Sequence, residues 1–229
     1  MKHLFGIILI ATIFQATILG QAADFDEQTR KINIYLHPAP VFDYTPRYRF
    51  GMELHNPSRL AFALDAGYGE SAINGWTEIG FIGNEYQLAE IRPEVKWYLT
   101  RYDFPVKWYV SSELFFIYMT DVMYDDYFHT EDDYNQITEF DRAVMEKMKG
   151  GLHLKFGVKR YLDSGVTLDI FGGIGVALRN ISYYQVENPN TYYDYSIWYE
   201  WFVPVYKFPG TSMIPHITMG FKLGYFWER

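Results

Sequence analysis

Residues 90–99 read EIRPEVKWYL, and the alternation of charge along them decides the fold. Ionised side chains occupy Glu90, Arg92, Glu94 and Lys96, and uncharged, mostly apolar residues fill the positions between them. A helix would spread these charges around its whole circumference, whereas a strand sorts them onto one face. Such a strand suits either a soluble sheet with its charges in water or a membrane barrel with its charges in the lumen.

The composition of the 229-residue chain excludes several classes of function. A formal net charge of −8 argues against a nucleic-acid partner, because it implies no basic face strong enough to collect phosphates. The absence of cysteine excludes disulfides, thiolate metal sites, a thiol nucleophile and a lipidated N-terminal cysteine. No motif points to a metal or a cofactor, so we expect none.

The start of the chain has the pattern of an export signal. A basic N-terminus precedes the apolar run LFGIILIATIFQATILG, and the small residues of GQAA suit a signal peptidase. We therefore expect a signal peptide at residues 1–22, a short periplasmic segment at 23–30 and a barrel domain at 31–229. The alternative is a single anchoring helix, since the run approaches membrane-spanning length.

Alternating segments recur along the rest of the chain and predict eight strands. One face of each segment is almost wholly apolar, and a charge there would cost about 2–4 kcal/mol at a bilayer midplane. The sequence therefore predicts an all-β fold, an eight-stranded antiparallel up-and-down transmembrane β-barrel. The strands are expected at roughly 31–41, 47–55, 59–68, 88–99, 106–119, 147–160, 166–180 and 213–227.

The opposite face mixes charged residues with glycine, which favours a narrow closed lumen. The interior of an eight-stranded barrel is only wide enough for side chains to fill it. Large charged residues there need small neighbours, and buried acids need bases within reach. Glycine has little use on a water-facing strand, which it weakens. The predicted lumen ion network consists of Arg49, Glu53, Glu90, Arg92, Glu94, Lys96, Glu113 and Lys155.

The connections between the predicted strands alternate between short and long. Short turns fall at 56–58, 100–105 and 162–165. Long segments fall at about 69–87, 120–146 and 181–212. Short periplasmic turns and long extracellular loops are the outer-membrane pattern, and we expect aromatic belts at both membrane interfaces. Within the second long segment, TEFDRAVMEKMK (138–149) is expected to begin with a short helix.

The closing stretch ITMGFKLGYFWER resembles the terminal strand of outer-membrane barrels. Thr218, Gly220, Leu223 and Tyr225 match its spacing of polar, glycine, apolar and aromatic residues. With the RPE-x-K strand at 92–96, the mature chain resembles small eight-stranded barrels of the OmpA/OmpX architecture, and within them uncharacterised families. The resemblance implies insertion by the barrel-assembly machinery into the outer membrane of a Gram-negative bacterium, and it implies no activity.

Two other interpretations stay open. The acidic segment DDYFHTEDD (125–133), with Asp126 and His129, would suit a lipid- or peptide-modifying outer-membrane enzyme, or it is a solvated loop. His55 and Ser58 are close in sequence but fall in a turn, which Ser58 caps. A soluble lipocalin-like ligand-binding barrel would turn the apolar face inward instead.

The segment 181–212 is unusually aromatic, with eleven Tyr, Trp and Phe residues. It suits either a hairpin that extends above the membrane or an exposed platform for an extracellular protein or glycan. Its candidate contact residues are Tyr193, Tyr195, Trp198, Tyr199 and Trp201. We therefore expect a monomeric, non-enzymatic barrel surrounded by outer-membrane lipid, with a charge-plugged lumen and a structural or surface-interaction role through its long loops.

Overall fold

The computed structural model describes most of the predicted barrel domain. The described residues are 31–43, 45–55, 59–70, 85–100, 106–130, 136–162, 165–193 and 207–228. The predicted signal peptide at 1–22 and the periplasmic segment at 23–30 lie outside them. None of the helices in these described ranges is long and apolar enough to cross a membrane.

The described chain consists of strands and one short 3-10 helix. The helix, η1, spans Ala39–Phe42. The strands are β1 Lys31–His37, β2 Tyr48–His55, β3 Leu60–Glu70, β4 Gln87–Tyr98, β5 Val106–His129, β6 Gln136–Tyr161, β7 Val166–Glu187, β8 Asn190–Tyr193 and β9 Gly210–Glu228.

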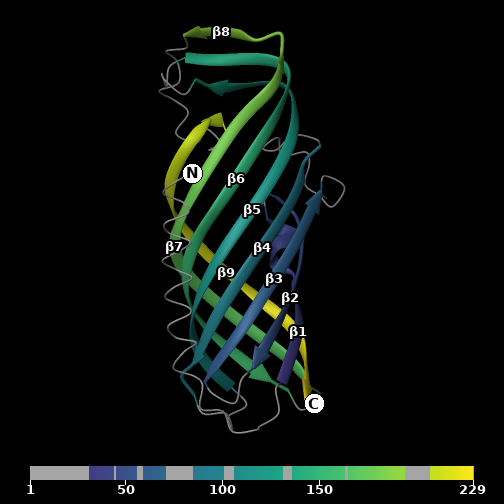
Figure 1. Ribbon diagram of the computed structural model, residues 1–229. Helices are drawn as coiled ribbons and strands as arrows, with labels where there is room; N and C mark the ends of the chain where they lie inside the picture. Colours follow the sequence, from purple (N-terminus) through teal and green to yellow (C-terminus); the bar gives the residue numbers. More distant parts are fainter. Residues whose placement is uncertain are drawn as a thin grey trace.

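The strands close into a ring (Figure 1). Neighbours pair in the order β5-β4-β3-β2-β1-β9-β7-β6, and a long β5–β6 ladder joins the two ends. Every pairing is antiparallel. The all-β antiparallel barrel is confirmed, but the described residues hold nine strands where eight were expected. The additional β8 pairs with β6 alone, at the first residues of β6.

The two faces of the strands differ sharply in exposure. Leu154, Ile170 and Phe221 on the outer face are 63%, 50% and 37% exposed. Arg92 and Glu94, which alternate with outward-facing residues of β4, are 3% and 2% exposed. A soluble barrel would show the reverse, because apolar side chains gain most from leaving water. The exposures confirm the two-faced pattern, and they exclude the lipocalin-like arrangement with its apolar face inward.

Glycines let large side chains fill the narrow interior. A Cβ on Gly157 would overlap the ring and hydroxyl of Tyr109, and one on Gly51 would overlap the Tyr35 ring and the Asp65 carboxylate. A tyrosine on one strand thus occupies the space above a glycine on the neighbouring strand. This close approach explains why glycines share the inner face with charged residues.

The predicted long segment at 120–146 is wrong, because strands occupy most of it. β5 continues to His129 and β6 begins at Gln136, and the two pair as far as His129 and Ile137. The short helix expected within 138–149 is therefore strand as well. β7 likewise continues to Glu187. These extensions form a tall antiparallel sheet that rises beyond the shorter strands (Figure 1).

The wall of the barrel is lowest at β1 and β2. These strands have 7 and 8 residues, whereas a transmembrane strand usually needs about 9–11. β1 pairs with β9 only from Leu223 to the end of β9. Residues 210–222 of β9 therefore have no partner on that side among the described strands, and the β1–β2 connection with η1 faces them. We call this stretch the seam.

Candidate functional site

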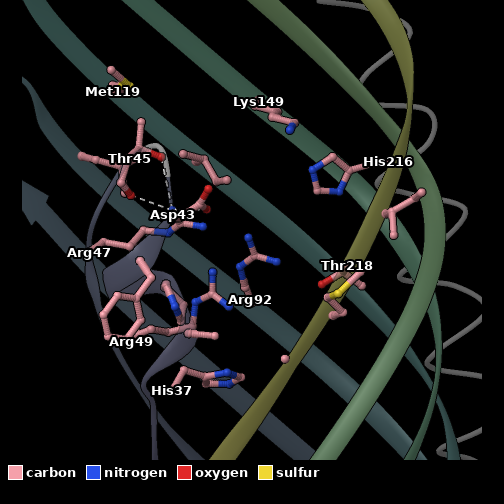
Figure 2. Close-up of a pocket in the computed structure, with 18 of the residues that line it drawn as sticks. His37, Asp43, Thr45, Arg47, Arg49, Arg92, Met119, Lys149, His216 and Thr218 are labelled. Carbon is pink, nitrogen blue, oxygen red and sulfur yellow. Dashed lines mark hydrogen bonds and ion pairs between the residues drawn. The ribbon is translucent and has the colours of Figure 1, made fainter. Parts of the chain in front are cut away.

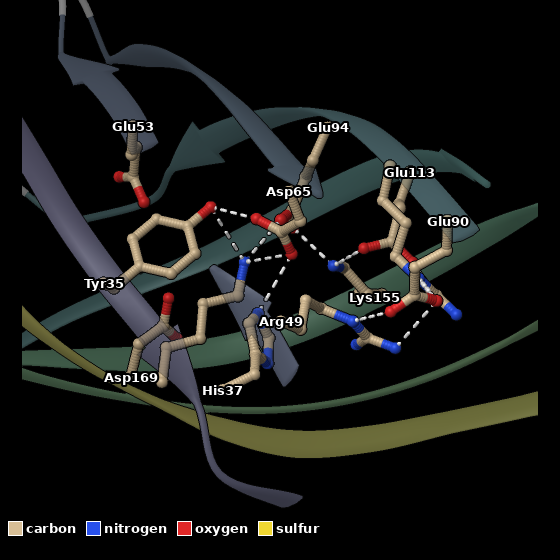
Figure 3. A network of polar contacts seen from close by, with 12 residues as sticks. Tyr35, His37, Arg49, Glu53, Asp65, Glu90, Glu94, Glu113, Lys155 and Asp169 are labelled. Atoms are coloured by element: carbon tan, nitrogen blue, oxygen red, sulfur yellow. Dashed lines mark hydrogen bonds and ion pairs between the residues drawn. The ribbon is translucent and has the colours of Figure 1, made fainter. Parts of the chain in front are cut away.

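The barrel interior is the candidate site, because strand alternation sends charged side chains from seven of the eight ring strands into it, and β1 adds Tyr35 and His37 (Figure 3). Those that form buried ion pairs among the described residues are the acids Glu53, Asp65, Glu90, Glu94, Glu113 and Asp169 and the bases Arg47, Arg49, Arg92, Lys96, Lys155, Lys159 and Lys222. Together they form three linked layers along the barrel axis.

The first layer is centred on Lys96, towards the end of the barrel where β9 finishes. Its ammonium group donates to Glu53 at 2.9 Å and to Asp169 at 2.7 Å. Lys159 pairs with the same Glu53 oxygen at 3.1 Å. The Tyr109 hydroxyl donates to Asp169 at 2.8 Å, and the Lys96 ammonium lies 4.4 Å from the centre of the Tyr109 ring. Each buried charge in this layer therefore has an opposite charge and a hydrogen-bond partner, as burial requires.

The second layer joins Glu94 and Glu113 through Lys155. The Lys155 ammonium lies 2.8 Å from a Glu94 oxygen and 2.7 Å from a Glu113 oxygen. Lys222 donates to the other Glu94 oxygen at 3.0 Å and lies 3.6 Å from Asp65. Glu94 of β4 is thus paired with bases from both β6 and β9, which links separate parts of the ring.

His37 completes this layer at Asp65, with its Nε2 2.9 Å from a carboxylate oxygen. Tyr35 donates a short hydrogen bond to the other Asp65 oxygen. His153 contacts Glu113 through Nδ1 at 3.0 Å and His216 through Nε2 at 2.5 Å. His153 and His216 therefore meet, whereas His37 contacts Asp65.

The third layer surrounds Glu90 with three guanidinium groups. The Nε atoms of Arg47 and Arg92 each lie 3.0 Å from a Glu90 oxygen. Arg49 forms a two-pronged pair with the same carboxylate, one contact of which is 3.2 Å. Arg92 also donates to Glu113 at 3.1 Å, and this contact links the third layer to the second. Guanidinium groups suit this crowding because their planar fork matches a carboxylate.

Aromatic rings fill the space that the ion pairs leave. Phe115 stacks on His153, and Arg92 lies 5.2 Å from the centre of the Phe115 ring. Phe171 lies beneath Lys155 at 4.6 Å from the ring centre. Each of these cations lies over the face of a ring, whose quadrupole attracts it. At the level of the three layers, charged and aromatic groups therefore pack against one another.

All eight residues predicted for the lumen network lie in these layers. The prediction of the network omitted Arg47, Asp65, Asp169, Lys159 and Lys222, and it also omitted the tyrosines that bond to the carboxylates. The inward position of these residues follows from the same alternation that identified Lys96 and Lys155. Their membership of the network depends on which strands meet across the barrel, which alternation alone does not give.

The candidate surface residues lie mostly outside the described ranges. Tyr193 is exposed at the end of β8. The others fall between 194 and 206 and are not described: Tyr195, Trp198, Tyr199 and Trp201.

Two residues of the enzyme interpretation, Asp126 and His129, contact the segment just before β9. Asp126 accepts from Lys207 at 2.7 Å, and the His129 ring stacks on Phe208 with centroids 4.4 Å apart. His55 lies 2.7 Å from Glu53 in the interior, while Ser58 is outside the described ranges. Within the described residues, no group of three or more His, Cys, Asp or Glu side chains is placed to hold a metal ion.

The chain has few similarities to known proteins. No protein-family model matches it, and no curated protein is similar to it in sequence. Among solved structures, it is similar to the crystal structure of a major outer membrane protein from Thermus thermophilus. The TM-score is 0.44 and the identity 11%, over 87% of this chain and 100% of that one.

Proposed function

We propose that this chain is a non-enzymatic integral outer-membrane barrel of a Gram-negative bacterium, with a lumen closed by its ion network. The observation that carries the proposal is the sidedness of the wall. Isolated exposed apolar residues are ordinary on soluble proteins, but a continuous apolar surface marks contact with a membrane or a partner. Here that surface follows every ring strand, while the charges lie inside.

Backbone hydrogen bonding between the strands also supports the proposal. In hydrocarbon, every peptide group needs an internal partner, and the ring of strands provides one along most of its circumference, the seam excepted. Export by the N-terminal signal and insertion by the barrel-assembly machinery would bring the chain to the outer membrane. We propose in addition that the layout of the barrel is that of small barrels of the OmpA/OmpX architecture.

The lumen is proposed to be closed to ions because the three layers occupy its cross-section. A conducting barrel needs a continuous column of water, whereas here carboxylates and bases from facing strands meet at hydrogen-bond distance across the interior. A structural role needs no pore. The tall sheet of β5, β6 and β7 would then present the exposed Tyr193 and its neighbours to an extracellular protein or glycan.

Planar bilayer recording tests the closed lumen. We expect purified, refolded protein to give no current steps above the background of the same bilayer, whereas a water-filled porin added as a positive control conducts. Heat-modifiable mobility on gels should verify that the sample is folded before each recording. Steady, reproducible current steps from the pure folded protein would contradict the closed lumen.

A further inference from the structure

A cavity of about 540 Å³ lies at the seam, above the third layer of the interior. One side is formed by the β1–β2 connection, including Pro40 and Phe42, and the other by His216–Gly220 of β9. Its floor is formed by Arg49 and Arg92. The size is typical of a site for a small organic molecule. The cavity thus lies between the charged interior and the unpaired edge of β9.

Basic side chains dominate the lining of the cavity. Figure 2 shows Arg47, Arg49 and Arg92 pointing into the same space as Lys149. Lys147 is the fifth cation of the lining. Three carboxylates pair with the arginines among the described residues: Asp43 with Arg47 at 2.8 Å, Glu90 with all three guanidinium groups, and Glu113 with Arg92. The two lysines have no such partner there, so the lining keeps an excess of positive charge.

The two lysines are the unusual members of this set. In the part of the chain that the structure describes, neither Lys147 nor Lys149 makes an ion pair with a carboxylate, whereas Lys96, Lys155, Lys159 and Lys222 all do. Uncompensated positive charge in a partly enclosed site is costly. An anion bound in the cavity would remove this cost, and the donor forks of three arginines match an oxyanion of phosphate type.

The seam indicates that the anion belongs to an amphiphile. Phe42, Ile217 and Met219 border the cavity and are among the most exposed apolar residues of the described chain. They lie where the cavity meets the outer face of β9, so an apolar chain leaving the cavity would reach lipid at once.

We propose that the cavity at the seam binds the phosphate group of an amphiphilic lipid, whose acyl chains lie against the outer face of β9. The lipid part of this assignment rests on the proposed membrane insertion of the barrel. Basic pockets next to an apolar wall bind lipid headgroups in this way in other membrane proteins.

Lipid retention by the detergent-solubilised full chain tests the assignment. Native mass spectrometry would compare phosphatidic acid, phosphatidylcholine and inorganic phosphate as probes. We expect one molecule of phosphatidic acid to be retained, little phosphatidylcholine, and no displacement by inorganic phosphate. Lys149→Gln should weaken phosphatidic acid binding about tenfold or more, since a charge-assisted contact is lost without leaving a carboxylate unpaired.

The matched control is Arg142→Gln, which removes one positive charge from the tall sheet, where Arg142 pairs with Glu187. It should leave lipid retention unchanged. Equal binding by Lys149→Gln and the unchanged chain, or equal retention of phosphatidylcholine, would overturn the proposal. Binding of inorganic phosphate as tight as that of phosphatidic acid would overturn the lipid assignment. Heat-modifiable mobility of each variant reports the barrel itself, so loss of the fold is distinguished from loss of the site.

A thiol at the cavity provides a second readout that needs no lipid. The chain has no cysteine, so Thr218→Cys would carry its only thiol. We expect an anionic thiosulfonate reagent to react about tenfold or more faster than a cationic one, because the excess positive charge concentrates anions there. Faster reaction with the cationic reagent would overturn the assignment of an anion site.

Discussion

Replacing Lys96 with methionine is expected to destabilise the folded barrel by about 3–5 kcal/mol, since breaking a buried ion pair leaves an uncompensated charge. Methionine keeps much of the volume and removes the ammonium group that joins Glu53 to Asp169. Glu53 retains Lys159, whereas Asp169 would retain only the Tyr109 hydroxyl among the contacts described here. Urea unfolding in lipid vesicles, followed by gel mobility and intrinsic fluorescence, measures the loss.

Two further variants separate charge from packing in this experiment. Arg142→Met breaks an exposed pair, whose side chains are 32% and 56% exposed, and should cost no more than about 1 kcal/mol. Adding Asp169→Asn to Lys96→Met removes the unpaired carboxylate and should restore much of the lost stability. A double variant no more stable than Lys96→Met alone would contradict the ion network as the source of the loss.

Leu154→Arg is expected to oppose insertion of the barrel by about 2–4 kcal/mol, the cost of a cation on the lipid face near the bilayer midplane. Leu154 lies on the outer face of β6 and pairs in register with Ile174 of β7. The measurement is the folding equilibrium of the mature chain in vesicles, together with its recovery in the outer-membrane fraction. A soluble protein would tolerate this exposed substitution, because an arginine there would lie in water.

Tyr193→Arg is the matched control for that substitution. Tyr193 is also exposed, but it lies in β8 at the end of the tall sheet, beyond the shorter strands of the ring. A charge outside the hydrocarbon carries little penalty, so insertion should be unchanged within about 1 kcal/mol. Equal effects of the two arginines would contradict a lipid environment at Leu154.

The sidedness of the barrel was predictable from the sequence because strand period fixes which way a side chain points. Glu90, Arg92 and Glu94 occupy alternate positions along β4, and all three point inward. The pairing of particular charges was not predictable in this way. Lys96 and Asp169 are 73 residues apart, and whether they lie at one level depends on the tilt and register of the strands between them.

The upper parts of β5 and β6 were not predicted to be strands, for a different reason. There the apolar side chains, including Met123, Phe140 and Met145, lie buried on the inner face, so the pattern of charges inside and apolar residues outside is lost. The stretch from Ala143 to Lys147 is also rich in residues with high helix propensity. It is strand because β5 pairs with it along its whole length, and such pairing outweighs local propensity.

Pro38 marks the end of β1 in the sequence. The predicted strand ran to residue 41, whereas β1 ends at His37, next to Pro38. Proline cannot donate to a ladder, so it favours the end of a strand. Pro93, by contrast, lies within β4, where the ladder to β5 is interrupted at residues 92 and 93. The early end of β1 is what creates the seam.

A fluorescent label at Leu154→Cys, in a chain that has no other cysteine, measures the environment of the outer face directly. In vesicles whose acyl chains carry bromine, we expect the label to be strongly quenched, and aqueous iodide should leave it almost unaffected. The same label at Tyr193→Cys should show the opposite pattern. Quenching of the Leu154→Cys label by iodide, with no effect of brominated lipid, would contradict a barrel embedded in the membrane.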